Sequence, residues 1–224
     1  MALKSYKPRS QGMRFRVSPT FEEITEKRPV KRLTKAVRKT AGRDNQGHIS
    51  TRHHGGGAKQ RMRIVDFKRV KQGVEATVKE IAYDPTRSAY LALLEYADGE
   101  LSYVLAPEGL KQGMKVMNGP KAEATVGNCL PLVQIPLGMF VHAIELVPGQ
   151  GAKVGRSAGN SCQIMARDGN VVTLKMPSGE VRMFDGRCLA CVGSVGNKDS
   201  ARSSSARPAA SAISASVRRF AVSP

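Results

Sequence analysis

The sequence is poor in cysteine, in aromatic side chains and in uninterrupted apolar runs. Its 224 residues include four cysteines, too few to staple a secreted scaffold of this length, so we expect reduced thiols and a cytoplasmic protein. The longest uncharged run, residues 124–144, contains Pro131, Pro136 and two glycines, which excludes a membrane-spanning helix. The first nine residues lack the apolar segment of a signal peptide. We therefore expect no membrane partner.

Acidic side chains are also scarce, and they are unevenly distributed. The chain has 36 lysines and arginines against 18 aspartates and glutamates, a formal net charge of +18. Residues 1–71 hold 20 basic and 5 acidic side chains, whereas residues 72–197 hold 11 and 12. Such an excess favours a polyanionic partner, and its position assigns that partner mainly to the first third of the chain.

Residues 1–41 are expected to form an extended basic arm. Pro8, Pro19 and Pro29 interrupt this stretch, and its apolar residues follow no sustained period, so it should not build a core of its own. A 3.6-residue pattern over residues 22–39 is broken at Pro29. No long helix is therefore expected.

The middle of the chain has the pattern of short strands separated by turns. Asp98-Gly99, Asp168-Gly169 and Ser178-Gly179 are typical hairpin turns. The expected strands are Arg63–Val70, Val74–Ile81, Tyr90–Tyr96 and Leu101–Leu105 in a first set, and Phe140–Val147, Cys162–Ala166, Val171–Met176 and Val181–Phe184 in a second.

Short strands at this spacing predict an all-β protein of two small barrels, because closure removes exposed sheet edges. We expect an OB-like barrel over residues 42–119 and an SH3-like barrel over residues 120–197, divided near Gly119-Pro120. Residues 198–224 are rich in serine and alanine and should form a disordered tail.

The strongest candidate for a binding site is the segment of residues 42–63, which reads GRDNQGHISTRHHGGGAKQRMR. Arginines supply bidentate contacts to phosphate, and Gly55, Gly56 and Gly57 would let a backbone approach where a Cβ would clash. His53 and His54 could stack on bases or hydrogen-bond to sugar and phosphate. Three consecutive glycines are costly to order, so we expect a partner to order this segment.

Two other kinds of site, a phosphate-binding loop and a zinc site, use residues of these types. A phosphate-binding loop of the Walker type would need a different order around Lys59, which follows Ala58 and precedes Gln60. Cys188-Leu-Ala-Cys191 has the spacing of half a zinc site, but a second pair is missing, and buried thiols in a β segment are the commoner fate of cysteine.

A catalytic set cannot be assembled from the sequence with any specificity. His142 lies in an apolar strand, where a histidine is more often a core residue than a catalyst, and the acidic residues form no distinctive pair. We therefore expect no enzyme, no catalytic residue, no metal and no cofactor.

In order along residues 1–200, the sequence resembles the family of bacterial-type ribosomal protein L2, the uL2 family. The segment at residues 42–57 is the first of eight motifs that match this family. The other matching motifs are Arg63–Arg69, Tyr83–Ser88, Tyr96–Glu100, Leu105–Leu110, Ile135–Gly138, Gly155–Gly159 and Pro177–Met183. The resemblance implies a large-subunit protein that binds 23S rRNA near the peptidyl transferase region, and it implies the same two barrels.

The resemblance also implies partners and contact residues. The partners are 23S rRNA, other large-subunit proteins, and the small subunit at an intersubunit bridge. By motif position, the residues expected to meet RNA are Arg43, Arg52, His53, His54, Gly55, Gly56, Gly57, Lys59, Arg61, Arg63, Lys68, Arg69, Arg87, Arg156, Ser157 and Arg182.

The sequence departs from the family after Ser200. Members of the family continue with a basic segment and a histidine-containing glycine-rich loop, whereas residues 201–224 here are rich in serine and alanine. We hypothesise a truncated C-terminus, produced by a frameshifted or prematurely ended reading frame. Resequencing the locus would test this, and an intact frame that ends at Pro224 would refute it.

Two alternatives stay open at the level of sequence. The first is a free OB-type module that binds single-stranded RNA or DNA on aromatic platforms, although aromatic residues make up only 5% of the chain and tryptophan is absent. The second is a zinc-dependent RNA-modifying enzyme that uses Cys188, Cys191 and a histidine. A footprint on one structured RNA site would argue against the first, and stoichiometric zinc would support the second.

Overall fold

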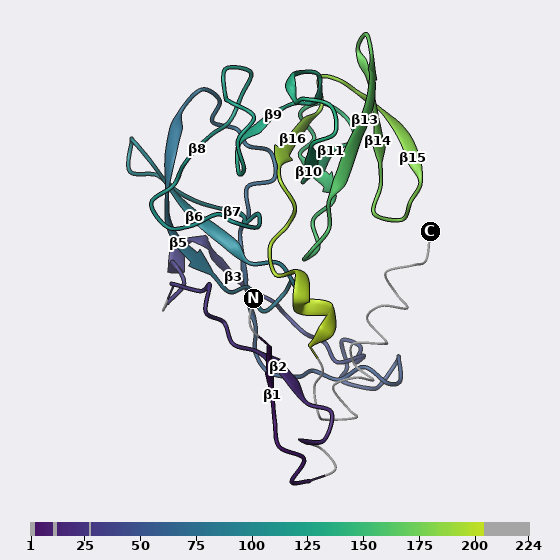
Figure 1. The fold of residues 1–224 in the computed structure, drawn as a ribbon. Coiled ribbons are helices and arrows are strands. Elements are labelled where there is room, and N and C mark those ends of the chain that lie inside the picture. The colour runs from purple at the N-terminus through teal and green to yellow at the C-terminus, as the bar shows by residue number, and fades with distance from the viewer. Residues whose placement is uncertain (1–2, 11–12, 27, 204–224) are drawn as a thin grey trace.

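The computed structural model describes residues 3–10, 13–26 and 28–203, and these residues form an all-β protein (Figure 1). Short 3₁₀ segments are found at Lys31–Leu33 (η2), Leu132–Gln134 (η3) and Lys198–Arg202 (η4). The all-β prediction is confirmed. No helix within the described ranges has the length and apolar character needed to cross a bilayer.

The first sheet has four antiparallel strands in the order β7-β6-β5-β8. Its strands are β5 (Glu75–Ala82), β6 (Leu91–Tyr96), β7 (Leu101–Leu105) and β8 (Lys115–Met117). Buried and exposed residues alternate along the first half of β5, so Ala76 and Val78 enter the core while their neighbours face solvent. The predicted turn at Asp98-Gly99 joins β6 to β7, with Gly99 in the left-handed region at φ 76°.

The second sheet has six antiparallel strands in the order β15-β14-β13-β10-β16-β9. Its strands are β9 (Cys129–Pro131), β10 (Phe140–His142), β13 (Cys162–Asp168), β14 (Val171–Lys175), β15 (Val181–Asp185) and β16 (Leu189–Val192). A separate pair, β11 (Ile144–Glu145) and β12 (Ala152–Val154), lies beside it. The predicted turns at Gly169 and Gly179 join β13, β14 and β15.

Two predicted strands are wrong in extent. The expected strand Arg63–Val70 is a strand only at β4 (Arg61–Arg63), because the Asp66 carboxylate then accepts bonds from the amides of Lys68 (3.0 Å) and Arg69 (2.9 Å) and turns the chain. The expected strand Phe140–Val147 is divided into β10 and β11 at Ala143, whose φ of 49° is left-handed.

The arm is extended, as predicted, but it also pairs with itself and with the barrels. β1 (Leu3–Ser5) and β2 (Val17–Pro19) form a two-stranded sheet at the lower end of the molecule in Figure 1. β3 (Thr34–Ala36) pairs with β4. The amides of Thr25 and Glu26 each donate to the Ile81 carbonyl at 3.0 Å, so the arm is hydrogen-bonded to the end of β5.

The two large sheets share a hydrophobic core. Leu91 and Tyr103 of the first sheet pack in one cluster with Cys129 and Cys191 of the second and with Val195 beyond it. Of the tail, residues 198–203 are described, and they include η4 in place of the expected disorder, while residues 204–224 lie outside the described residues. Because their core is shared, the sheets hold the loops of both units in a fixed relation.

Candidate nucleic-acid interface

The glycine-rich segment closes on itself between β3 and β4. The Gly42 carbonyl accepts bonds from the amides of Ser50 (2.9 Å) and Thr51 (3.1 Å), and the Asp44 carboxylate caps two further amides of the turn. Gly42 is required here, since a Cβ on it would lie 2.2 Å from the Thr51 carbonyl oxygen. Part of this segment is thus ordered by its own hydrogen bonds, in contrast to the expectation that only a partner orders it.

Four cations of this segment are exposed and have no carboxylate partner among the described residues. Arg43, Arg52, Lys59 and Arg61 all face solvent. None of these four side chains forms an ion pair with a described residue. The charge excess seen in the sequence is therefore available at the surface to a polyanion.

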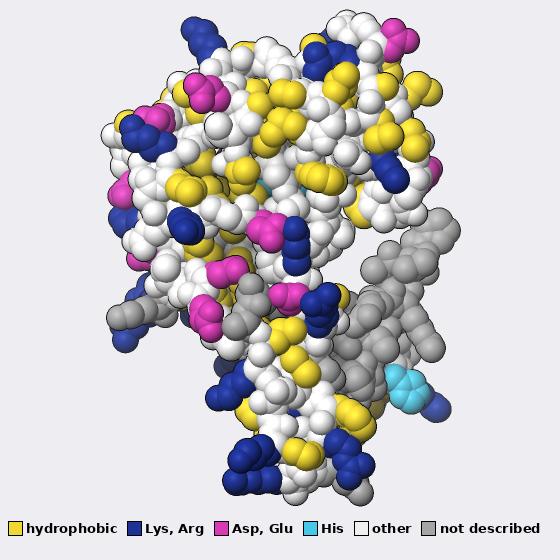
Figure 2. Space-filling model, viewed as in Figure 1, with side chains coloured by type: hydrophobic (Ala, Val, Ile, Leu, Met, Phe, Trp, Pro, Cys, Tyr) yellow, Lys and Arg dark blue, Asp and Glu magenta, His cyan; other side chains and the backbone are white. Residues whose placement is uncertain are grey.

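Three of the five acidic side chains in the first third accept hydrogen bonds from neutral groups. Asp44 and Asp66 accept from backbone amides, and Glu26 accepts from the hydroxyl of Tyr103. Figure 2 shows lysines and arginines, without acidic side chains, at the lower end of the viewed face. These carboxylates therefore stabilise turns and packing and do not neutralise the exposed lysines and arginines around them.

Gly55 and Gly56 differ from Gly42, whereas Gly57 resembles it in having a left-handed φ, of 59°. A Cβ on Gly55 would meet no protein atom within 4 Å, and one on Gly56 would make only an ordinary contact, 3.6 Å from Ala41. Nothing inside the folded chain explains the absence of a side chain at Gly55. A close approach by a molecule from outside would explain it.

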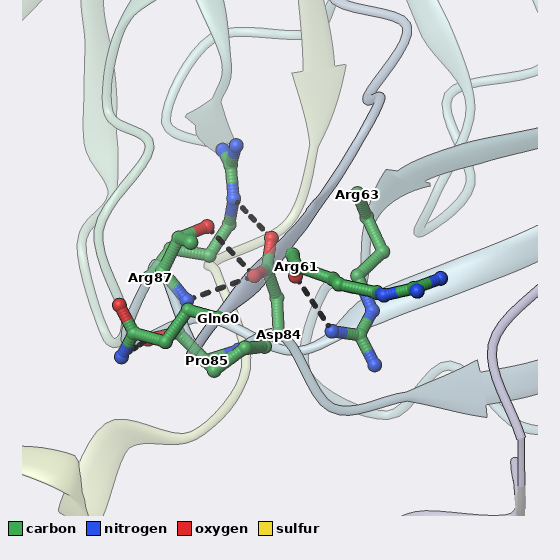
Figure 3. A network of polar contacts seen from close by, with 7 residues as sticks. Gln60, Arg61, Arg63, Asp84, Pro85 and Arg87 are labelled. Atoms are coloured by element: carbon green, nitrogen blue, oxygen red, sulfur yellow. Dashed lines mark hydrogen bonds and ion pairs between the residues drawn. The ribbon is translucent and has the colours of Figure 1, made fainter. Parts of the chain in front are cut away.

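A buried carboxylate builds the neighbouring turn at residues 84–87 (Figure 3). Asp84 is 0% exposed; it accepts from the Thr86 amide (2.8 Å), the Thr86 hydroxyl (2.7 Å) and the Arg87 Nε (2.9 Å). The Gln60 side-chain amide donates to the Pro85 carbonyl at 3.3 Å. The turn is therefore fixed, and it is joined to the end of the glycine-rich segment.

Phe67 brings three of the predicted motifs together. The guanidinium of Arg87 lies 5.4 Å from the centre of the Phe67 ring, and that of Arg156 lies 4.9 Å from it. The Ala158 amide donates to the Ser88 hydroxyl at 3.2 Å, which ties the loop of residues 155–159 to the loop of residues 83–88. Phe67 was not named as a site residue from the sequence, although two predicted contact arginines lie against its ring.

Arg63 and Arg69 are placed differently from the prediction that they meet RNA. Arg63 is 9% exposed, and its Nη1 donates to the Arg61 carbonyl at 3.0 Å. Arg69 is 8% exposed, and its Nη2 donates to the Cys191 sulfur at 3.6 Å, inside the core that the two sheets share. Both side chains are buried, so we remove them from the candidate contact set.

The cysteines are buried, as the β-segment interpretation of Cys188 and Cys191 predicted. Cys191 lies opposite Cys129 across β16 and β9 rather than against Cys188. The hydrogen bond with Cys129, together with the Arg69 guanidinium, holds the pKa of Cys191 well below its usual value. Among the described residues, no three histidine, cysteine or acidic side chains are grouped as a metal site.

His142 is a core residue, as its apolar strand suggested. It is fully buried; its Nδ1 lies 2.8 Å from the Gly193 carbonyl, and burial lowers its pKa. An Nδ1–H tautomer that donates to this carbonyl fits the neutral form. The contact accounts for Nδ1, while Nε2 is buried without a hydrogen-bond partner among the described residues.

The remaining predicted residues divide into two places. His53, His54, Lys68 and Ser157 are exposed, the histidines on the glycine-rich segment and the other two near Phe67. Arg182 lies on β15 at the far edge of the second sheet, where its Nε bonds to Glu180 at 2.8 Å. Figure 1 shows β15 at the edge of the second sheet, away from β3 of the first part of the chain.

The tyrosines of the first sheet point inward. Tyr90, Tyr96 and Tyr103 are all buried in the core. A single-strand-binding module needs aromatic faces that are open to bases, and these three rings do not offer them.

Two family models match the chain. Residues 30–118 match the RNA-binding N-terminal domain of ribosomal proteins L2, and residues 125–222 match the C-terminal domain of the same proteins. The matches agree with the OB-like and SH3-like barrels predicted from the sequence, and the first covers almost all of the interface described above. The second match extends over the tail, most of which lies outside the described residues.

Proposed function

The chain belongs to the family of ribosomal protein L2, and we propose from this premise that it is a non-catalytic constituent of the large ribosomal subunit. In this proposal it binds 23S rRNA near the peptidyl transferase region, in the cytoplasm. Other large-subunit proteins would be its neighbours, and the small subunit would meet it at an intersubunit bridge.

One observation carries the proposal, namely that Arg43, Arg52, Lys59 and Arg61 are exposed and have no carboxylate partner in the described part of the chain. A folded protein that leaves so many like charges unpaired accepts a repulsive cost, which a polyanion removes on binding. Release of counterions from the neutralised phosphates would then drive association. The matched RNA-binding domain covers this same segment.

The proposed contacts come from three segments that hydrogen bonds connect, from Gln60 to Pro85 and from Ala158 to Ser88. The residues are Arg43, Arg52, His53, His54, Gly55, Gly56, Gly57, Lys59, Arg61, Lys68, Arg87, Arg156 and Ser157. Arg87 and Arg156 are held on Phe67, so their ordering cost is reduced before RNA arrives. Arg182 would meet a different RNA segment, because β15 lies at the opposite edge of the fold.

Binding of the full chain to a 23S rRNA transcript tests this function. We expect binding that survives excess transfer RNA and single-stranded polyuridine, and that falls about tenfold in Arg52→Gln, as the loss of a charge-assisted contact of roughly 1.4 kcal/mol would give. Lys115→Gln is the matched control, since Lys115 is paired with Glu75 at 3.0 Å on the first sheet. Equal competition by polyuridine, or equal loss in both variants, would refute the proposal.

A further inference from the structure

The two-stranded sheet of β1 and β2, with the loop that joins them, forms a cationic ribbon, described at residues 3–10 and 13–19. Residues 1–21 contain five lysines and arginines and no aspartate or glutamate. All five are exposed, and none forms an ion pair with a described residue; they are Lys4, Lys7, Arg9, Arg14 and Arg16. The match to the RNA-binding domain begins at residue 30, so it assigns no role to the ribbon.

Phe15 adds an aromatic ring to this charge. Its side chain is 75% exposed, more than that of any other described aromatic residue. Single exposed apolar residues are common on protein surfaces, so the exposure alone assigns no function. The position of this ring is what points to a ligand, because it stands between Arg14 and Arg16 in a segment without carboxylates.

Hydrogen bonds and a ring contact hold the loop around Phe15. The Arg14 amide donates to the Ser10 carbonyl at 3.2 Å. The guanidinium of Arg16 lies 4.9 Å from the centre of the Tyr6 ring, in the geometry of a cation–π contact. The exposed ring and its neighbouring cations are thus positioned before a partner binds, which lowers the cost of ordering them.

The ribbon is joined to the proposed RNA surface through η4. β2 lies beside η4, and Figure 1 shows β1 and β2 below it. A Cβ on Gly159 would lie 3.2 Å from the Cα of Lys198 in η4, so η4 packs against the loop of residues 155–159. That loop carries Arg156, one of the proposed contacts.

The groups of the ribbon define the chemistry of its partner. Nucleobases stack on aromatic rings, and phosphates form charge-assisted hydrogen bonds with arginine, so an RNA strand offers a partner for both kinds of group. Binding to an anionic membrane would need a larger apolar surface, since its strength scales with the apolar area that is buried. Phe15 is the only large apolar side chain that is exposed among the described residues of the ribbon.

We propose that the ribbon is a second RNA-binding element, in which Phe15 stacks on one unpaired base and Arg14 and Arg16 bind the phosphates beside it. The RNA is that of the proposed function, on which this inference rests. Every base has a π face, so stacking on Phe15 adds affinity without selecting one base.

A single tryptophan at position 15 reports directly on stacking. The chain contains no tryptophan, so Phe15→Trp in the full chain carries one fluorescent indole at the proposed contact. We expect the 23S transcript to quench this emission saturably, because a stacked base quenches indole. Phe140→Trp is the matched control and should be unchanged, since Phe140 is 52% exposed on the second sheet.

Two further probes separate stacking from other causes of a fluorescence change. Inorganic polyphosphate supplies charge without bases, and we expect it to leave the emission of Phe15→Trp unquenched. Equal quenching by polyphosphate would overturn the proposal. A blue shift with vesicles of phosphatidylserine and phosphatidylcholine, without quenching by the transcript, would also overturn it and assign the ribbon to a membrane.

Phe15→Leu measures what the ring contributes to affinity. Leucine keeps an apolar side chain at this exposed position but lacks a π face, so we expect unchanged thermal stability and about tenfold weaker binding of the transcript. Phe15→Tyr should bind as the wild type does, and Phe140→Leu should leave binding unchanged. Unaltered affinity in Phe15→Leu, or an equal loss in Phe140→Leu, would contradict the assignment.

Filter binding of the wild type to the same transcript distinguishes the two proposals. Transcript binding without quenching in Phe15→Trp refutes the role of the ribbon alone. Absence of transcript binding refutes the proposed function and, with it, the RNA to which the ribbon is assigned.

Discussion

Two glycines of the basic segment serve different purposes at the scale of single residues. Gly42 has a left-handed φ of 69°, and its missing side chain makes room for the Thr51 carbonyl. Gly55 has open space around it and no positive φ. The folded chain requires the first glycine, and we propose that contact with RNA accounts for the second.

Replacing each glycine by alanine tests this difference. We expect Gly55→Ala to change the free energy of unfolding by less than about 1 kcal/mol and to weaken binding of the 23S transcript by roughly tenfold, because a methyl group would face the RNA. Gly42→Ala should instead lower stability by about 1–2 kcal/mol. Thermal melting and filter binding give the two readouts, and an unchanged affinity in Gly55→Ala would contradict this explanation.

Whether an individual arginine is exposed or buried could not be predicted from the sequence. Arg61 and Arg63 are two residues apart on β4, yet the first is exposed and the second buried. Arg69 is buried because Cys191, 122 positions further along the chain, lies against its guanidinium. Local pattern identifies a basic segment, but only long-range packing decides which of its cations remain at the surface.

The turn of residues 84–87 is the element on which two parts of the interface depend. The Asp84 carboxylate accepts hydrogen bonds from Thr86 and Arg87. The Pro85 carbonyl accepts a hydrogen bond from the Gln60 side chain of the glycine-rich segment. We expect Asp84→Asn to lower the free energy of unfolding by about 2 kcal/mol, because a buried charged acceptor is lost, and to weaken RNA binding because Arg87 is released. Chemical denaturation and filter binding measure both effects.

Asp185→Asn is the matched control for this element. Asp185 also pairs with an arginine, Arg187, at 2.7 Å, but Arg187 is largely exposed and the pair lies on the second sheet. Exposed pairs contribute little, so we expect a stability change below about 1 kcal/mol and unchanged RNA affinity. Equal effects of the two substitutions would mean that the turn has no special part.

Strands with hairpin turns were predictable, and strands defined by distant contacts were not. The turn Asp98-Gly99 is flanked by the strands Leu91–Tyr96 and Leu101–Leu105. Neighbouring residues alone therefore predict that these two strands pair. β8, β9 and β12 have three residues each, too few for a recognisable period, and they exist because of partners elsewhere in the fold. The bend at Ala143 has no sequence signal either, since alanine rarely takes a positive φ.

The motifs that contribute to the candidate site could be predicted from the sequence, but the contacts that join them could not. The motifs around residues 42–63, 83–88 and 155–159 were identified separately, and the structure joins the last two at Phe67. Phe67 was missed because a partly buried aromatic residue within an apolar motif looks like core. The signal that could have found it is its place beside two arginine-bearing loops, which requires the fold.

At the scale of the whole molecule, the excess positive charge lies in residues 1–71, whereas residues 72–197 form the two large packed sheets. Residues 72–197 are nearly neutral, and many of their charges are paired, as in Lys79 with Glu95. The first 71 residues carry a net charge of +15, and Arg43, Arg52, Lys59 and Arg61 make no ion pair with a described residue, whereas Lys71 pairs with Asp98 and Glu100. The neutral sheets provide rigidity, and the cationic segments laid against them provide the attraction for RNA.

This division predicts a steep dependence of RNA binding on salt. If about six to ten phosphates are contacted, the affinity should fall by about 10³–10⁵ between roughly 50 and 200 mM salt. The double variant Arg43→Gln/Arg52→Gln should reduce the slope of log K against log salt by about 1.5–2. Each phosphate contact that is lost leaves its counterions on the RNA, so fewer counterions are released on binding. Lys79→Gln/Lys115→Gln removes the same charge from paired, exposed lysines and should leave the slope nearly unchanged. Equal reductions in the two variants would show that net charge alone, and not the unpaired cations of the glycine-rich segment, determines binding.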